Sequence, residues 1–316
     1  MKIVILDRNT VTNEDVSFAE IEALGEVEYF DVLSQEKLVS AIGDAEVVVC
    51  NKAKLDRNVI ENCKNLKYIG LFATGYNNID TDCAKEKGIV VCNVPGYSTE
   101  AVAQLTFSMI LALAGSFCEY TASTRSGGWI KSDTFSYFPF PLRELKGKTL
   151  GIFGYGSIGR EVAKIGRAFG MEIIAYTRTP SKVSDAEVVS LEELFRRSDY
   201  LSLHAPLTPE TTKIINPETL SLMKRSAYLI NTSRGGAIDE EALAKALNEG
   251  TIAGAGLDVL TVEPMEEKNP LRTARNCLIT PHIAWAPFET RVRLITMVAE
   301  NIKAFVEGSP INVVNR

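Results

Sequence analysis

Short apolar runs alternate with amphipathic segments along the first hundred residues of the chain. The apolar runs predict buried strands at residues 2–6, 27–30, 46–50, 68–72 and 89–92. Segments with the apolar spacing of a helix lie between them, at residues 18–24, 35–42, 56–62 and 80–87. Strands that alternate with helices in this way predict a parallel sheet with helices on both faces.

The same alternation starts again near residue 149. Strand-like runs follow at residues 149–153, 172–176, 200–203, 227–231, 254–257 and 277–280, over the length of one doubly wound nucleotide-binding domain. Helical patterns at residues 101–118 and 288–306 bracket this unit, and the chain ends in an apolar tail at residues 311–314. We therefore expect an α/β protein with two doubly wound parallel-sheet domains. Residues 1–99 and 287–316 would form a discontinuous first domain that the tail rejoins, and residues 100–286 an inserted dinucleotide-binding domain.

Residues 119–144 interrupt this alternation of predicted strands and helices. They contain Gly127-Gly128-Trp129 and an aromatic, proline-bearing stretch at residues 135–141. An irregular segment of this length is uncommon in a compact domain, and its aromatic content predicts contact with another surface. The preceding segment, residues 101–118, is apolar on nearly every side, which favours burial between domains or subunits over a membrane span.

Composition narrows the class of protein. A length of 316 residues fits two domains, and a net charge of −6 gives no support for binding nucleic acid or an anionic membrane. The apolar run at the start of the chain is too short for a signal peptide, and the acidic residue Asp7 follows it directly. Six scattered cysteines without a Cys-x-x-Cys pair are typical of reduced core residues in a cytoplasmic protein, and a zinc site is not expected.

A glycine motif follows the run at residues 149–153. Gly154, Gly156 and Gly159 have the spacing G-x-G-x-x-G and precede a helical pattern at residues 160–168. In that context Gly154 would make a tight turn, Gly156 would let the backbone approach a pyrophosphate, and Gly159 would permit close packing of helix on strand. Amides at the start of the helix would stabilise the phosphate charge. The alternative is an ordinary tight turn.

The end of the next strand, residues 172–176, bears on the choice of cofactor. An acidic residue there binds the ribose hydroxyls of NAD, but this chain has Thr177 and Arg178, with Lys182 nearby. A hydroxyl and two cations attract a 2′-phosphate, whereas a carboxylate would repel it. We therefore predict a preference for NADP(H), with NAD(H) possible. The alternative is that Arg178 stacks on the adenine and either cofactor is used.

Three polar residues lie just beyond apolar strand-like runs: Arg234, Glu263 and His282. Ligands bind at the carboxyl ends of strands in open α/β sheets, so these side chains are candidates for one site. An arginine fork suits a carboxylate and can polarise a carbonyl, and a carboxylate can orient an imidazole and stabilise its protonated form. Such an imidazole can protonate the oxygen of a ketone that receives a hydride. The alternatives are a solvated loop arginine, a turn-capping glutamate and a buried structural histidine.

These motifs together resemble the D-2-hydroxyacid dehydrogenases, and the resemblance runs essentially from end to end. It rests on Gly154-Tyr155-Gly156-Ser157-Ile158-Gly159, Asn231-Thr232-Ser233-Arg234-Gly235, Gly256-Leu257-Asp258-Val259, Glu263-Pro264 and Pro281-His282. It implies a flavodoxin-like substrate domain and an inserted Rossmann cofactor domain. It further implies that Arg234 binds the 2-oxo acid, that Glu263 pairs with His282, and that His282 is the catalytic acid/base.

The resemblance also implies which residues lie along the cofactor. They are Gly154, Gly156, Ser157, Ile158, Gly159, Thr177, Arg178, Thr179, His204, Ala205, Pro206, Thr211, Thr232, Ser233, Asp258 and Ala284. His204 matches a strand end that lines the cofactor, and no catalytic role is expected for it. Asp258 has a helix cap as its alternative.

Residues 72–80 match the family's substrate loop. Backbone amides near Thr74 and Gly75 can hold a carboxylate, because Gly75 has no side chain to block the approach. The alternative is a plain turn before a helix. The substrate-binding residues implied in full are Lys52, Ala73, Thr74, Gly75, Tyr76, Arg234, His282 and Trp285. For Lys52 and Tyr76 a surface or packing role is an equal alternative.

Several features narrow the member of the family. The chain shows no regulatory domain or basic cluster of the kind expected for phosphoglycerate dehydrogenases, and Glu263 differs from the neutral amide of formate dehydrogenases. Trp285 and the Thr-Arg-Thr segment at residues 177–179 are similar to hydroxypyruvate and glyoxylate reductases. We therefore expect reduction of hydroxypyruvate to D-glycerate or of glyoxylate to glycolate.

Two other functions stay open. D-lactate dehydrogenase is the enzymatic alternative, and a dinucleotide-sensing corepressor without turnover is the alternative from another class. The resemblance also implies a homodimer that forms through the helix at residues 101–118 and the arm after it, to about residue 145.

Overall fold

The computed structural model describes residues 1–316, which form two compact units. The first comprises Met1–Ser98 and Trp285–Arg316, and the second comprises Thr99–Ala284. The sequence predicted domain boundaries after residues 99 and 286, and in the structure the units change after Ser98 and Ala284.

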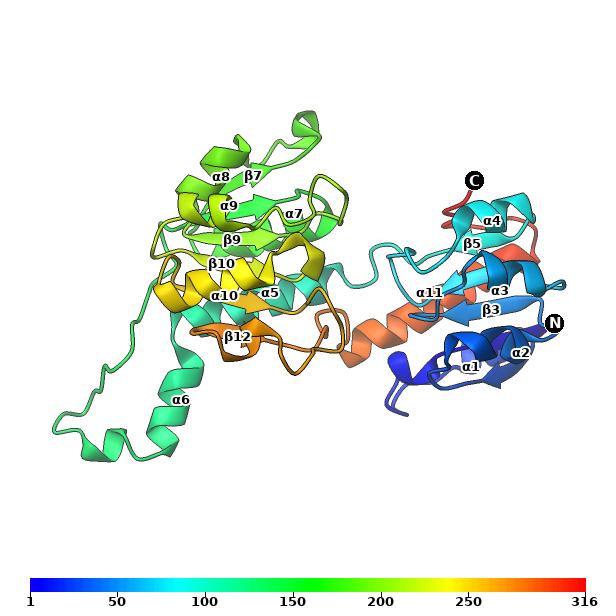
Figure 1. Ribbon diagram of the computed structural model, residues 1–316, viewed down its shortest axis with the longest axis horizontal. Coiled ribbons are helices and arrows are strands. Elements are labelled where there is room, and N and C mark those ends of the chain that lie inside the picture. The colour runs from blue at the N-terminus through cyan, green and yellow to red at the C-terminus, as the bar shows by residue number, and fades with distance from the viewer. The chain divides into compact units, whose positions relative to one another are not determined.

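The first unit is built on a five-stranded parallel sheet (Figure 1). Its strands are β1 (Lys2–Ile5), β2 (Glu26–Tyr29), β3 (Val47–Cys50), β4 (Tyr68–Leu71) and β5 (Val90–Cys92). They lie in the order β2-β1-β3-β4-β5, which is the flavodoxin-like order and confirms the predicted fold class for this part of the chain.

Helices cover both faces of this sheet. They are α1 (Ala19–Glu22), α2 (Leu38–Ile42), α3 (Arg57–Asn62), α4 (Thr81–Glu86) and α11 (Phe288–Val306). Apolar residues of α2, α3 and α4 pack on one face, and those of α1 and α11 pack on the other. The C-terminal tail returns to the sheet, where Val313 forms an antiparallel bridge with Cys92 of β5.

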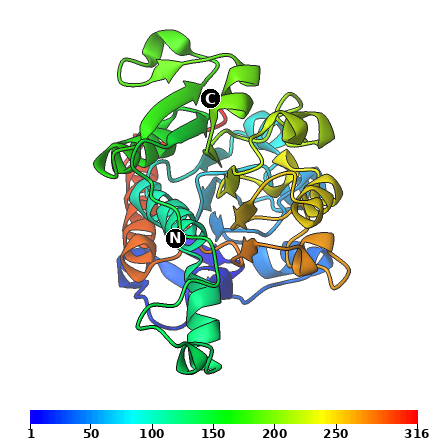
Figure 2. The same cartoon turned by 90° about the vertical axis from the view of Figure 1, so that its left-hand side faces the viewer.

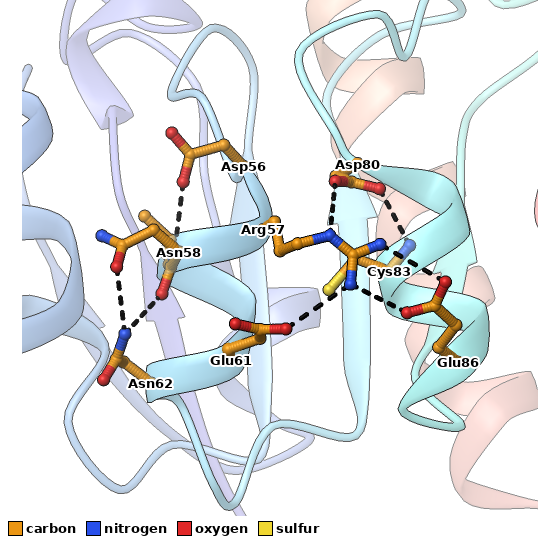
Figure 3. A network of polar contacts seen from close by, with 9 residues as sticks. Asp56, Arg57, Asn58, Glu61, Asn62, Asp80, Cys83 and Glu86 are labelled. Atoms are coloured by element: carbon orange, nitrogen blue, oxygen red, sulfur yellow. Dashed lines mark hydrogen bonds and ion pairs between the residues drawn. The ribbon is translucent and has the colours of Figure 1, made fainter.

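A polar network joins α3 and α4 on the outside of this unit (Figure 3). The Arg57 guanidinium donates to Glu86 at 2.8 Å and lies 3.4 Å from Glu61. Asp56 and Asp80 cap the two helices by accepting hydrogen bonds from backbone amides of their first turns. The side chains are exposed to solvent, so we assign this network a structural role of modest energy.

The second unit contains a seven-stranded parallel sheet in the order β12-β11-β10-β9-β6-β7-β8. Its strands are β6 (Thr149–Phe153), β7 (Glu172–Tyr176), β8 (Glu187–Val188), β9 (Tyr200–Leu203), β10 (Tyr228–Asn231), β11 (Gly254–Leu257) and β12 (Cys277–Ile279). This is the Rossmann order with one added strand, and it confirms the predicted fold class here too. Figure 1 shows β7, β9, β10 and β12 in succession down the sheet.

The helices of the second unit also form two layers. They are α5 (Thr99–Ala114), α6 (Phe117–Arg125), α7 (Ser157–Ala168), α8 (Leu191–Arg197), α9 (Pro217–Leu222) and α10 (Glu240–Glu249). Apolar residues of α5 and α7 pack on one face, and those of α8, α9 and α10 pack on the other. Short 3-10 helices lie at Arg8–Thr10, Gln35–Lys37, Trp129–Lys131, Pro180–Lys182, Gly235–Ala237 and Pro270–Thr273.

Three sequence predictions were wrong in detail. The single helix expected at residues 101–118 is two helices, because α5 ends before Gly115 and Ser116 adopts a positive φ of 43°. The segment expected to be irregular from residue 119 is helical to Arg125 and then extends as an arm away from the sheet (Figures 1 and 2). Among the cysteines expected in the core, Cys118 is exposed.

No helix taken singly has both the length and the apolar composition needed to cross a membrane, although α5 and α6, bent by 58°, pass that test as a pair.

Candidate active site

The glycine motif forms a tight turn between β6 and α7. Gly154 has a φ of +97°, and a Cβ there would lie 2.6 Å from the amide nitrogen of Ala205. A Cβ on Gly159 would lie 2.3 Å from the carbonyl oxygen of Gly154, so both positions require glycine. A Cβ on Gly156 would meet no atom within 4 Å, so the turn leaves open space at that position.

This turn has the chemistry that a dinucleotide requires. Gly156 caps α7 and provides no capping side chain. The first amides of an α-helix have no partner within the helix, and they carry the positive end of its dipole. Open space at Gly156 in front of these amides fits a pyrophosphate.

The end of β7 carries no acidic side chain. Thr177 is half-buried, and its hydroxyl oxygen accepts a hydrogen bond from the amide of Thr179 at 3.4 Å. Arg178 is exposed, and no carboxylate lies within ion-pair distance of it. The segment Thr177 to Thr179 therefore carries one positive charge and no carboxylate.

Glu263 and His282 meet at the carboxyl edge of the second sheet. Nδ1 of His282 lies 2.6 Å from Oε2 of Glu263, and the two side chains are 26% and 34% exposed. The other carboxylate oxygen of Glu263 accepts from the amide of Leu260 at 3.0 Å, which holds the carboxylate in place. With Nδ1 bound to Glu263, Nε2 is the ring nitrogen that is available to a ligand.

Asp258 holds the loop that carries His282. Its buried carboxylate accepts hydrogen bonds from the Thr280 hydroxyl at 2.6 Å and from the amides of Ile283 and Ala284 at 2.8 Å. Its backbone carbonyl accepts from the amide of His282, which has a positive φ of 56°. Burial raises the pKa of the Asp258 carboxyl above its ordinary value, and these hydrogen bonds counteract the rise in part. Both carboxylate oxygens are thus engaged with the His282 loop.

Asn231 holds the loop that carries Arg234. Its fully buried side-chain amide donates to the carbonyl of Arg234 at 2.9 Å, and its oxygen accepts from the amide of Ser233 at 3.0 Å. A Cβ on Gly235 would lie 1.9 Å from the carbonyl carbon of Leu260, so this loop packs directly on the segment that leads to Glu263. The Arg234 side chain is exposed and donates to the carbonyl of Ser233 at 2.7 Å.

His204 differs sharply from His282. Its Nε2 lies 2.8 Å from the Ser202 hydroxyl, while its buried Nδ1 has no partner. Burial lowers the pKa of His204 to about 3, so this ring is neutral near pH 7 and is a poor proton donor.

The other residues implied along the cofactor lie in the same unit. The Thr211 hydroxyl donates to the carbonyl of Pro206 at 2.8 Å, which closes the loop after His204 and Ala205. The hydroxyl of Thr232 lies 3.0 Å from that of Thr106 on α5, in a buried contact.

In the first unit, a chain of side-chain amides supports the Thr74 loop. Asn93 donates to the carbonyl of Thr74 at 2.6 Å, and Asn301 of α11 donates to the carbonyl of Asn93 at 2.9 Å. Asn312 of the tail then donates to Asn301 at 2.9 Å. Sequence reasoning missed these three asparagines. A signal was present for Asn93, which is a polar residue directly after an apolar run.

A buried carboxylate supports the loop of Lys52 in a similar way. Asp7 accepts hydrogen bonds from the amides of Asn51, Lys52 and Ala53 at 2.9, 2.6 and 2.8 Å. The Lys52 side chain is exposed.

The remaining substrate candidates belong to this unit as well. Tyr76 is 42% exposed, and Trp285 is half-buried against the core that α11 covers. The amide of Val94 donates to the carbonyl of Ala73 at 2.9 Å, and Gly75 is half-buried. The structure thus brings together Glu263 with His282, and the Arg234 loop with the segment before Glu263, within one unit.

The fold and the glycine turn define a dinucleotide-binding protein with a histidine–carboxylate pair at its sheet edge. Residues 107–284 match the family described as D-isomer specific 2-hydroxyacid dehydrogenase, NAD binding domain. The chain is 42% identical to a hydroxypyruvate reductase from Blautia hydrogenotrophica, with 100% of both chains covered. It is 39% identical to a glycerate dehydrogenase from Methylorubrum extorquens, with 99% and 98% covered.

Solved structures agree with these matches. An NADPH-dependent glyoxylate/hydroxypyruvate reductase from Sinorhizobium meliloti, in complex with NADP and malonate, has a TM-score of 0.84 at 30% identity, with 99% of this chain and 96% of that chain covered. A D-lactate dehydrogenase from Aquifex aeolicus, complexed with NAD and lactic acid, has a TM-score of 0.83 at 32% identity, with 100% and 99% covered. The chain belongs to the D-isomer specific 2-hydroxyacid dehydrogenase family, as its sequence motifs predicted, and its second unit matches the NAD-binding domain of that family.

The hydrogen bonds of Asp258 lead to a prediction. Asp258→Asn should lower kcat by about 10- to 100-fold, because an asparagine has one acceptor oxygen and leaves the His282 loop misplaced. Thr280→Val is the graded control, since it removes only one of the three bonds and should have a smaller effect. Steady-state rates and the midpoint of thermal unfolding should be measured together. An unchanged kcat in Asp258→Asn would contradict the positioning role.

Proposed function

We propose that this protein is an NAD(P)H-dependent reductase of small 2-oxo acids, with hydroxypyruvate and glyoxylate as its preferred substrates. The observation that carries the proposal is the 2.6 Å contact between Glu263 and His282 at the carboxyl edge of the cofactor sheet. Relatives named hydroxypyruvate reductase, glycerate dehydrogenase and glyoxylate reductase, at 39–46% identity, support the substrate class.

Each residue of the trio has a distinct task in this reaction. Arg234 binds the substrate carboxylate and polarises the neighbouring ketone through its planar fork. A nicotinamide nucleotide held at the turn of Gly154 and Gly156 would supply the hydride for the ketone carbon. His282 donates a proton from Nε2 to the ketone oxygen, while Glu263 holds the ring through Nδ1. A hydride on carbon and a proton on oxygen together give the 2-hydroxy acid.

We propose that the first unit has substrate-binding residues of its own. Amides near Thr74 and Gly75 bind the carboxylate, and Asn93 keeps that loop in place through its bond to the carbonyl of Thr74. Lys52, Tyr76 and Trp285 are the other substrate-binding residues that we propose in this unit.

The test of this function is a panel of 2-oxo acids with wild-type protein and His282→Ala. Hydroxypyruvate and glyoxylate should give the highest kcat/KM, and His282→Ala should lower kcat by about 10²- to 10⁴-fold because the proton donor is lost. Arg272→Ala is the matched surface control and should keep the wild-type rate. The highest kcat/KM with pyruvate would support a D-lactate dehydrogenase instead. Cofactor binding without turnover of any acid would support a dinucleotide sensor.

A preference for NADP(H) is part of the proposal. The end of β7 presents Thr177, Arg178 and Thr179 without a carboxylate, and the Sinorhizobium meliloti enzyme of this fold was solved with NADP. Arg178 would pair with the 2′-phosphate in a charge-assisted hydrogen bond.

Substitutions at this strand end test the preference. Arg178→Gln should raise KM for NADPH by about tenfold or more and leave KM for NADH nearly unchanged, because only NADPH has the phosphate. Thr177→Asp should shift the preference toward NADH, since a carboxylate repels the phosphate and binds ribose hydroxyls. The preference is refuted if the wild-type protein has the higher kcat/KM with NADH.

A homodimer through α5, α6 and the following arm is also proposed. Large apolar side chains of this region are exposed to solvent: Phe117 is 67% exposed, Ile130 87%, Phe135 90% and Phe138 74%. A concentration of exposed aromatic residues of this kind marks a protein contact surface.

The mass in solution tests the dimer. Wild-type protein should show twice the chain mass of 34.6 kDa by light scattering, and Phe135→Ser with Phe138→Ser should shift it toward one chain mass because the apolar contact is lost. Val32→Ser is the control, since Val32 is 71% exposed in the other unit. A wild-type mass of one chain would rule out the dimer.

A further inference from the structure

Three arginines surround a hollow in the second unit, away from the candidate active site. The hollow has a volume of about 200 Å³, and Arg143, Arg225 and Arg275 line it. The buried side chains of Tyr228 and Ile252 contribute to its wall. The Nε of Arg225 donates to the carbonyl of Gly250 at 3.4 Å, which draws that side chain to the hollow.

The hollow lies at the opposite edge of the sheet from the trio. Tyr228 is the first residue of β10, and Asn276, which also lines the hollow, immediately precedes β12. Arg234 and His282 follow the carboxyl ends of these same strands. A strand of four residues spans about 13 Å, so one ligand of this size cannot occupy both places.

The three guanidinium groups have no carboxylate partners. No aspartate or glutamate oxygen lies within 4.0 Å of Arg143, Arg225 or Arg275. Six other arginines do pair with carboxylates: Arg57, Arg160, Arg167, Arg196, Arg197 and Arg291. Arg225 also lines an adjacent hollow together with Glu249, whose carboxylate lies 3.9 Å from Lys245.

Three exposed arginines around one hollow give it a positive charge that favours a bound anion. In a chain with a net charge of −6, acidic side chains are plentiful, yet none forms an ion pair with these three arginines. Like charges at close range repel one another, and a bound oxyanion would remove that repulsion while accepting hydrogen bonds from the guanidinium forks.

We propose that this hollow is a second anion-binding site, which takes a small oxyanion with at least two negative charges. Its volume is below that of pockets for drug-sized ligands, which are about 300–1,000 Å³, so a pyrophosphate or a tricarboxylate fits better than a dinucleotide. The shared chemistry is a set of phosphate or carboxylate oxygens that several guanidinium groups bind together.

The experiment is calorimetric titration of the full chain with pyrophosphate and, separately, with citrate, in the presence of saturating NADPH. NADPH occupies the glycine turn, which would otherwise compete for pyrophosphate. Arg225→Gln with Arg275→Gln should raise the Kd of the bound anion at least tenfold, and Arg143→Gln alone should raise it by a smaller factor. Arg272→Gln with Arg316→Gln is the matched control, because it removes the same charge from exposed positions outside the hollow.

The outcomes separate the possibilities. Binding of pyrophosphate alone assigns the site to phosphate compounds, and binding of both anions assigns it to polyanions in general. The proposal is overturned if neither anion binds saturably, or if the Kd in Arg225→Gln with Arg275→Gln equals that of the control. The substituted residues are all exposed, and unchanged thermal unfolding will show that each variant is folded. These results do not depend on which 2-oxo acid the protein reduces.

Discussion

The parallel register of β10, β11 and β12 is the constraint on which the candidate site depends. Asn231 pairs with Leu257, and Leu257 pairs with Ile279, so the last residues of three strands lie side by side. The segments that follow therefore all start from one edge, although they are far apart in the chain. Arg234 lies three residues beyond β10, and His282 lies three residues beyond β12. A slip of one residue in either pair would turn the strand's side chains to the other face and displace the loop after it.

Buried polar groups fix the positions of the loops that start from this edge. Asp258 and Asn231 bind the backbones of the loops that carry His282 and Arg234, and Asp7 and Asn93 do the same for loops of the first unit. Burying such groups costs free energy unless their hydrogen bonds are made, and here backbone amides and carbonyls make them. Each loop therefore has one favourable backbone conformation. The exposed side chain on the loop is not needed to stabilise that conformation, so it is available to bind a ligand.

Most strands could be predicted because strands covered on both faces appear as continuous apolar runs. The helix α11 was predicted with its observed bounds for a related reason, since one apolar stripe packs on the sheet. The strand β8 could not be predicted, because Glu187 and Val188 are both exposed and only pairing with β7 makes them a strand. The break between α5 and α6 was missed because apolar residues continue on both sides of Gly115, and hydrophobicity alone does not report backbone conformation.

The sequence by itself determined the fold class, the family and the residue types available at the sheet edge. These follow from local patterns, namely the period of apolar residues and the short motifs around Gly154, Arg234 and His282. Only the tertiary structure decided that Nδ1 of His282 is bound to Glu263 and that Nδ1 of His204 is buried without a partner. It alone also placed three unpaired arginines from distant segments around one hollow. Such contacts depend on register and packing between segments far apart in the chain, and no local pattern carries that information.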